Sequence, residues 1–440
     1  MTLVRFAPSP TGRLHLGNAF IALVNSLFAR KSGGRFLLRL DDTDRERSTA
    51  AFASAIESDL AWLGIEWDDF ARQSARLDRY DAAIDRLKAS GRLYACYETP
   101  EELALKRKAQ LNAGRPPVYD RAALVLSDAD KTALEANGIL PHWRFLLQGD
   151  DPRWADLVQG DSHIQIASMS DPVLVRADGV PLYTLASVVD DGEMGVTHII
   201  RGADHLSNTG VQLQLFAALG FAAPAFAHLP LISDAEGQGL SKRIGSLSLE
   251  SLREGGLEPL SIASLLLRLG QGEPPEPCPD WPSLIEAFDI AKFGHATPRL
   301  SEDDLTAMNA KLLHALPYAA VADRLPEGAD AALWEAVKGN IQRLSDIADW
   351  QRIVVGTVET PPPEDPELLD KAADLLPPDP WDTGTWKAWT KAVQEATGRK
   401  GKALFLPLRL ALTGREHGPE LANLLPLIGR ARVLDRLCRR

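Results

Sequence analysis

The sequence of 440 residues predicts an α/β fold with a doubly wound parallel sheet, an α+β insertion and an all-helical C-terminal region. Short apolar runs alternate with amphipathic segments up to residue 94 and again from 181, as in parallel strands joined by helices. Between 95 and 180 this alternation gives way to short alternating strands such as 143–147 and 163–167. After residue 245 the pattern is helical.

The first eighteen residues predict a strand, a polar loop and the start of a helix. Leu3 to Phe6 is mainly apolar, and Pro8 and Pro10 then exclude a helix. A helix begins near Gly17, and its amino end offers free N–H groups and a positive dipole that suit an anion. Its apolar face consists of Phe20, Leu23, Val24, Leu27 and Phe28, and it ends at Gly33-Gly34.

The rest of the α/β pattern places polar side chains where strands end. A second strand at 35–41 is followed by Asp41, Asp42 and Asp44, at the edge where open α/β sheets keep their ligands. The further expected helices and strands are the helices 49–63, 77–90 and 209–219 and the strands 196–201 and 228–232.

Composition and charge restrict the classes of protein. No run approaches ~20 apolar residues, so no membrane span is expected. Three distant cysteines (Cys96, Cys278 and Cys438) fit a reducing cytoplasm without a disulfide framework. The net charge is −12, but residues 399–440 hold ten Lys or Arg and three Asp or Glu, a net of +7. A polyanion could bind this segment, although a solvated helix face would look the same.

Two separated motifs resemble the signatures of class I aminoacyl-tRNA synthetases. They are PSPTGRLHLGN at 8–18 and LSKR at 240–243. The segment RFAPSPTGRLHLGNA, followed by RLDDTDRERS at 39–48, is similar to the bacterial type of glutamyl-tRNA synthetase in particular. The stretches VVDDGEMGVTHIIRGADHLSNT (188–209) and GKALFLPLRLALTGREHGPEL (401–421) extend this resemblance across most of the chain.

Formation of an aminoacyl-adenylate requires ATP to be held while a carboxylate attacks its α-phosphate. The nucleophile is already ionised, so the protein needs phosphate-binding groups rather than a general base. His15, Lys242 and Arg243 are the expected catalytic residues, and the chemistry of ATP implies Mg²⁺, which leaves no separate motif. The expected ATP-binding residues are Pro8, Gly17, Asn18, Asp204, His205, Ser241 and Lys242. Gly239 stands where the family usually has a first lysine, which leaves Lys242 as the main cation of the motif.

The resemblance also implies a pocket for glutamate. Arg5 and Arg201 are expected to bind its side-chain carboxylate, and Asp41 its α-ammonium. The other expected pocket residues are Ser9, Tyr183 and Ser187. Asp41 stands where the family often has glutamate, and Ser187 where some members have asparagine. For Arg201 taken alone, a surface salt bridge with Asp204 is an alternative interpretation.

The resemblance implies four domains in five segments of the chain. They are a Rossmann-like catalytic domain in two halves (1–94 and 181–245), an acceptor-binding insertion (95–180), a helical stem-contact domain (246–315) and a helical anticodon-binding domain (316–440). Asp44 and Arg47 are assigned to the acceptor end of tRNA. Cys96 is the only cysteine in the insertion, so we expect no structural zinc and no other metal site in the protein itself.

The expected function is therefore ATP-dependent ligation of glutamate to tRNA(Glu) by a cytoplasmic, monomeric enzyme. Charging of tRNA(Gln), in addition or instead, stays open. The resemblance further implies that glutamate is activated only with tRNA bound. A glutamyl-queuosine synthetase would end near residue 300, and a glutaminyl enzyme would carry a β-barrel module. A small-molecule nucleotidyltransferase would not need the basic helical tail, and a non-catalytic tRNA-binding paralogue is the remaining alternative.

Overall fold

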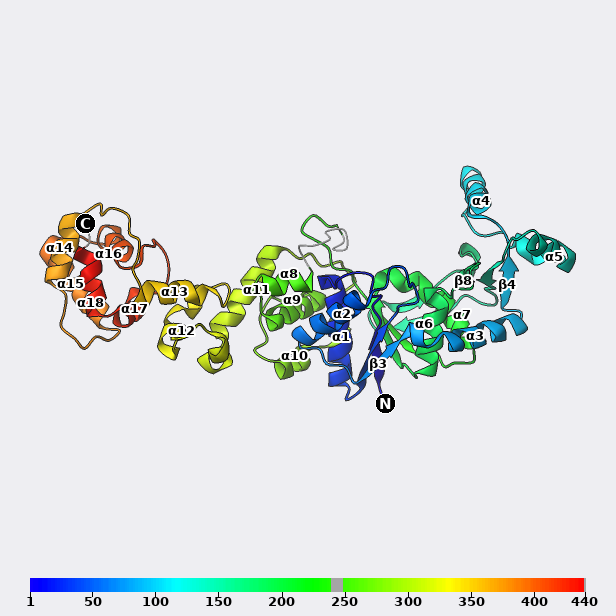
Figure 1. The fold of residues 1–440 in the computed structure, drawn as a ribbon, viewed down its shortest axis with the longest axis horizontal. Helices are drawn as coiled ribbons and strands as arrows, with labels where there is room; N and C mark the ends of the chain where they lie inside the picture. Colours follow the sequence, from blue (N-terminus) through cyan, green and yellow to red (C-terminus); the bar gives the residue numbers. More distant parts are fainter. Residues whose placement is uncertain (239–247, 439–440) are drawn as a thin grey trace. The chain divides into compact units, whose positions relative to one another are not determined.

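The computed structural model describes residues 1–238 and 248–438 (Figure 1). The chain divides into two compact units. The first consists of residues 1–254, 263–275 and 280–301, and the second of 255–262, 276–279 and 302–440. Within the described residues no helix is long and apolar enough to cross a membrane. The expected domains are finer than this division, and their boundaries stay predictions.

The first unit is built on a mostly parallel sheet. Its strands are β1 (Leu3–Phe6), β2 (Arg35–Leu40), β3 (Asp69–Arg72), β6 (Arg153–Asp156), β7 (Gly160–His163), β9 (His198–Gly202) and β10 (Ala225–Leu229). Strands β1, β2 and β3 are parallel neighbours, and so are β9 and β10. The Thr197 N–H donates to the Leu3 carbonyl at 2.9 Å, which places β9 beside β1. The order is therefore β3-β2-β1-β9-β10-β6-β7, which confirms the predicted parallel α/β fold.

Helices accompany this sheet (Figure 1), and the first of them shows how its local sequence defines its start. The helices are α1 (Leu16–Lys31), α2 (Ala50–Trp62), α3 (Leu77–Ala89), α6 (Tyr183–Glu193) and α7 (Leu206–Ala218). His15 caps α1, since its Nδ1 accepts a hydrogen bond from the Gly17 N–H at 3.0 Å. Phe20, Leu23 and Leu27 of α1 are buried, as the apolar spacing predicts.

Residues 93–175 form a second, antiparallel sheet and also contribute to the first. The second sheet contains β4 (Leu93–Cys96), β5 (His142–Phe145) and β8 (Val173–Val175). The helices α4 (Pro100–Asn112) and α5 (Asp128–Ala136) have no buried residue. The β6–β7 hairpin instead extends the main sheet, because β6 pairs with β10 at Asp156 and Phe226.

Two expected strands are misplaced. The strand expected at 163–167 is wrong, because β7 ends at His163 and Ile166–Ser168 forms a 3₁₀ turn. The strand expected at 228–232 is β10, which ends at Leu229. Pro230 follows directly, and a proline has no N–H to donate to a neighbouring strand. The chain beyond β10 therefore leaves the sheet as a loop.

Three short helices complete the first part of the helical region, α8 (Leu249–Glu254), α9 (Pro259–Gln271) and α10 (Trp281–Ala287). The chain before α8 returns to the start of α1. Ser248 forms a bridge with His15, and the Leu249 N–H donates to the Leu14 carbonyl at 3.0 Å. The described chain therefore resumes at Ser248 beside the amino end of α1.

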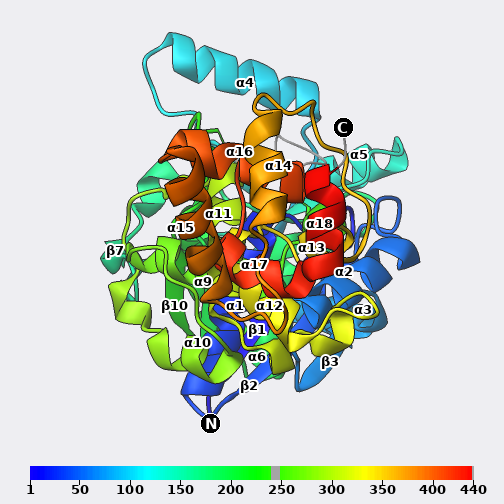
Figure 2. The ribbon, with the colours of Figure 1, turned by 90° about the vertical axis from the view of Figure 1, so that its left-hand side faces the viewer.

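The second unit has helices and no strand among its described residues, which confirms the predicted all-helical C-terminal region. Its helices are α11 (Glu302–Ala315), α12 (Ala331–Val337), α13 (Asp346–Val355), α14 (Pro366–Asp374), α15 (Thr385–Thr397), α16 (Lys402–Thr413), α17 (Leu421–Ile428) and α18 (Arg430–Cys438). Helix α14 packs against α15 and α18 (Figure 2). Trp334 and Trp389 are almost fully buried in the core of this unit.

Candidate active site

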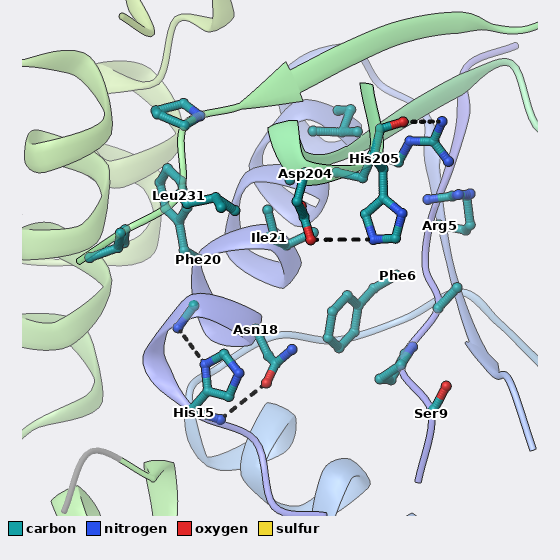
Figure 3. Close-up of a pocket in the computed structure, with 18 of the residues that line it drawn as sticks. Arg5, Phe6, Ser9, His15, Asn18, Phe20, Ile21, Asp204, His205 and Leu231 are labelled. Carbon is teal, nitrogen blue, oxygen red and sulfur yellow. Dashed lines mark hydrogen bonds and ion pairs between the residues drawn. The ribbon is translucent and has the colours of Figure 1, made fainter. Parts of the chain in front are cut away.

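A cavity of about 540 Å³ opens at the carboxyl ends of β1 and β9 (Figure 3). Strand order reverses between these strands, because β2 follows β1 on one side and β9 lies on the other. Open α/β sheets bind their ligands at this kind of switch point. The cavity is lined by Arg5, Phe6, Ala7, Pro8, Ser9, His15, Gly17, Asn18, Phe20, Ile21, Tyr183, Ile200, Arg201, Gly202, Asp204, His205, Pro230, Leu231 and Ile232.

One side of the cavity is the amino end of α1. The His15 N–H donates to Asn18 Oδ1 at 3.3 Å, while His15 Nδ1 accepts from Gly17. Burial lowers the pKa of His15, so the ring is neutral near pH 7. Since Nδ1 accepts, the ring proton is on Nε2, where it can donate to an anion. This Nε2–H and the helix dipole together suit a phosphate group.

Arg201 is a buried cation in the wall of the cavity. The residue is only 5% exposed, and burial lowers the pKa of its guanidinium. Its Nη2 donates to Thr209 Oγ1 and to Gln212 Oε1, both at 2.7 Å. Its Nε donates to His228 Nε2 at 3.2 Å. Among the described residues, all of its hydrogen-bond partners are neutral groups, and the surface salt bridge with Asp204 is not found.

Arg5, in contrast, is already paired with a carboxylate. Its Nε contacts Asp191 Oδ1 at 3.2 Å, and Arg39 Nη1 contacts the same oxygen at 2.7 Å. Burial opposes ionisation of Asp191, but Arg5 and Arg39 outweigh it and hold its pKa below the ordinary value. Arg39 also pairs with Asp41 at 2.8 Å. A buried network of alternating charges therefore lies behind the Arg5 side of the cavity.

Tyr183 and His205 lie close to Arg201. Arg201 Nη1 lies 3.5 Å from the Tyr183 hydroxyl, and the rings of Tyr183 and His205 are 5.7 Å apart. His205 Nε2 is 3.8 Å from an oxygen of Asp204. Burial lowers the pKa of His205. In Figure 3, Arg5 and His205 lie on one side of the cavity, with His15 and Asn18 on another.

Some expected site residues do not line this cavity. Asp41 directly follows β2 and Ser187 lies within α6, and both side chains are buried. The Ser187 hydroxyl has no hydrogen-bond partner among the described residues. Arg47 is exposed and Asp44 is half-buried, and the two are paired with each other at 2.7 Å. Ser241, Lys242 and Arg243 lie outside the described residues, as does Gly239. Their roles stay predictions.

The insertion contains no group that could hold a metal among its described residues. Cys96 is buried, and its Sγ lies 3.7 Å from the Tyr119 hydroxyl. Burial raises the pKa of the Cys96 thiol to about 11, so a thiolate ligand is disfavoured. The absence of a structural zinc stays a prediction.

Sequence reasoning missed the residues that support the cavity from behind. Arg39, Asp156, Asp191 and His228 are all buried and contact one another or the arginines of the cavity. A signal was present, because each is a charged or ionisable residue within an apolar strand or helix. Such groups are buried only when they are paired.

Two family models match consecutive parts of the chain. Residues 1–293 match the family model described as tRNA synthetases class I (E and Q), catalytic domain. Residues 300–439 match the model described as an anticodon binding domain. Both matches agree with the motifs quoted from the sequence.

Relatives and solved structures extend over nearly the whole chain. Glutamate–tRNA ligase 2 of Methylorubrum populi is 59% identical and covers 99% of this chain and 98% of the relative. A glutamate–tRNA ligase of Azospirillum brasilense is 56% identical with the same coverage. The crystal structure of a glutamate tRNA ligase from Elizabethkingia meningosepticum, in complex with its amino acid, has a TM-score of 0.83 and 27% identity, covering 99% of this chain and 98% of that one.

Proposed function

The chain belongs to the class I tRNA synthetases of the E and Q group, and we propose that it ligates L-glutamate to tRNA(Glu) with ATP. The carboxylate of glutamate attacks the α-phosphate, which forms glutamyl-adenylate and releases pyrophosphate. The glutamyl group then passes to the terminal adenosine ribose of the tRNA. The relatives named above carry the name of this activity.

The observation that carries the choice of glutamate is the charge state around Arg201. A buried cation without a carboxylate partner is costly, and a carboxylate from the substrate would compensate it. Among the described residues, Nη1 has only the Tyr183 hydroxyl at 3.5 Å, so it is the part of the guanidinium available to a ligand. The amide of glutamine would leave the charge uncompensated, which favours glutamate.

The phosphates of ATP are proposed to bind at the amino end of α1. His15 Nε2–H and the free helix N–H groups would stabilise charge as it moves onto pyrophosphate. Pro8, Gly17 and Asn18 line this end, and Asp204 and His205 are proposed to contact the nucleotide. Mg²⁺ would bind with the ATP and neutralise part of the phosphate charge when present.

The tRNA is proposed to contact both units. We assign its acceptor end to the segment 95–180 and to Asp44 and Arg47, and its anticodon to the helices after 316. The net charge of +7 in residues 399–440 supports a polyanion at the second unit. We propose that the active form is a cytoplasmic monomer that charges tRNA(Glu), with tRNA(Gln) as the substrate to be tested beside it.

Exchange of labelled pyrophosphate into ATP tests this proposal. The assay supplies tRNA and offers glutamate, glutamine or aspartate in separate reactions. We expect exchange with glutamate and background exchange with the other two. Exchange with glutamine would contradict the role of Arg201, and no exchange with any amino acid would favour the non-catalytic paralogue.

Replacing Lys242 with alanine is expected to lower the rate of glutamate activation by about 10²–10³-fold. Lys242 is the expected cation for the charge that develops on pyrophosphate, so the loss should appear in kcat rather than in the KM for glutamate. Single-turnover adenylate formation measures it. The control is Lys292→Ala, because Lys292 is half-exposed and pairs with Glu273. An unchanged rate in Lys242→Ala would remove this residue from the assignment.

The raised pKa of Asp41 predicts that kcat/KM for glutamate depends on pH. Burial raises its pKa to about 6, although Arg39 opposes the shift. Above this pH Asp41, which lies behind the cavity and does not line it, is an anion whose charge can stabilise a bound α-ammonium, and below it the carboxyl is neutral. We therefore expect kcat/KM for glutamate to fall about tenfold per pH unit below pH 6. The variant Asp41→Asn should not show this fall below pH 6. Identical pH profiles of kcat/KM in parent and variant would contradict the assignment.

A further inference from the structure

A buried chain of hydrogen bonds connects Arg201 to an aspartate on another strand. His228 Nδ1 lies 2.5 Å from Asp156 Oδ2, and both side chains are fully buried. His228 Nε2 faces Arg201 Nε at 3.2 Å and Thr209 Oγ1 at 2.9 Å. Thr209 Oγ1 in turn accepts from Arg201 Nη2 at 2.7 Å. The chain therefore contacts two of the three nitrogens of the guanidinium.

The protons in this chain have one consistent arrangement. Asp156 Oδ1 accepts from the N–H groups of Val158, Gln159 and His228 at 3.0–3.1 Å. Burial opposes ionisation of Asp156, but the hydrogen bonds outweigh it and its pKa lies at about 2. Asp156 is thus an acceptor at neutral pH, and His228 must donate from Nδ1.

The other side of the ring must then accept. Burial lowers the pKa of His228, so its Nε2 carries no proton and can accept from Arg201 Nε and from the Thr209 hydroxyl. If the ring had the opposite tautomer, Nε2–H would face the N–H of Arg201. The negative charge of Asp156 therefore determines whether His228 holds Arg201 or repels it.

We propose that Asp156 and His228 are positioning residues for glutamate selection, which hold Arg201 so that Nη1 is left for the substrate carboxylate. With Nε bound to His228, and Nη2 bound to Thr209 and Gln212, only Nη1 has no partner closer than 3.5 Å in the part of the chain that the structure describes. This inference rests on the proposed function, because it assigns Arg201 to glutamate. It adds that the β6–β7 hairpin, which lies within the segment 95–180, also supports the amino-acid pocket.

The variant Asp156→Asn tests this inference with an almost isosteric change. The new amide can donate to His228 Nδ1, which would shift the ring proton to Nε2 and break the contact with Arg201. We expect the KM for glutamate to rise about tenfold or more, with the KM for ATP unchanged. The matched control is Asp161→Asn, the same chemical change at an exposed position of the same hairpin.

The change in the KM for glutamate, compared with the change in the KM for ATP, decides the outcome. An unchanged KM for glutamate, or equal increases for glutamate and ATP, would overturn the inference, since the second result is a general structural effect. If Asp156→Asn does not fold, Thr209→Val provides the same test, because valine keeps the shape and removes the hydroxyl from the chain. Charging by the parent chain tests the proposed function itself, whereas the ratio of variant to parent tests only the positioning role.

Discussion

Replacing Arg201 with alanine should reduce kcat/KM for glutamate by about 10²-fold or more. A hydrogen bond to a charged group contributes roughly 1.5–3 kcal/mol, and a carboxylate on a buried guanidinium accepts more than one. The residue is 5% exposed and has neutral partners among the described residues, so the substrate carboxylate would be its only compensating anion there. Steady-state charging with varied glutamate measures the loss.

The control for this variant is Arg176→Ala. Arg176 is largely exposed and pairs with Asp178 at 2.9 Å, so its loss removes the same charge without affecting the cavity. We expect the control to keep the parent's KM for glutamate. The Arg201 variant should also lose its preference for glutamate over glutamine. A variant that keeps both its KM and this preference would show that another group binds the side-chain carboxylate.

Replacing Arg39 with methionine should destabilise the first unit by about 3–5 kcal/mol. Arg39 is fully buried and contacts carboxylates of Asp41, Asp190 and Asp191 at 2.8, 3.6 and 2.7 Å. Its loss leaves these carboxylates together in the interior with less positive charge to balance them. Urea unfolding measures the effect, with the transition of the first unit treated separately because two units need not unfold together.

The pH dependence of this loss separates charge from packing. Without Arg39, the folded-state pKa of Asp191 should rise, and that of Asp41, which burial already raises to about 6, should rise further. Protonation then favours the folded state, so stability is lost as pH rises and regained as it falls. The deficit should therefore shrink as the pH falls through these raised pKa values. The control Arg72→Met should change stability by less than about 1 kcal/mol, since its pair with Glu57 at 3.6 Å is exposed. A deficit that is independent of pH would indicate a packing defect instead.

Local patterns predicted the elements of the fold better than their pairing. The apolar face of α1 and the helical second unit follow from strong periodicity, and both are confirmed. The position of β6 beside β10 could not be predicted, because it depends on a pairing between residues 156 and 226 that no local signal encodes. The strand expected at 228–232 extends too far, because β10 ends at Leu229. Pro230 marks this end in the sequence, but the apolar residues around it favoured a longer strand.

The candidate site was predictable where one motif holds its residues together. Arg5, Ser9, His15 and Gly17 come from one stretch of sequence, and Arg201 comes from another, and the structure brings them to one cavity. The supporting residues are different, because His228 and Asp156 are separated by 72 residues and meet only after the sheet has formed. Their chemistry was visible as ionisable groups in apolar strands, but their partners were not.

Charging of purified tRNA(Glu) and tRNA(Gln) with labelled glutamate, each in a separate reaction with ATP and Mg²⁺, tests the central claim most directly. The account predicts that glutamate becomes attached to tRNA(Glu), and that label on tRNA(Gln) would identify an enzyme that serves both. No label on either tRNA, from protein that is folded and binds tRNA, would contradict the assignment of a glutamate–tRNA ligase.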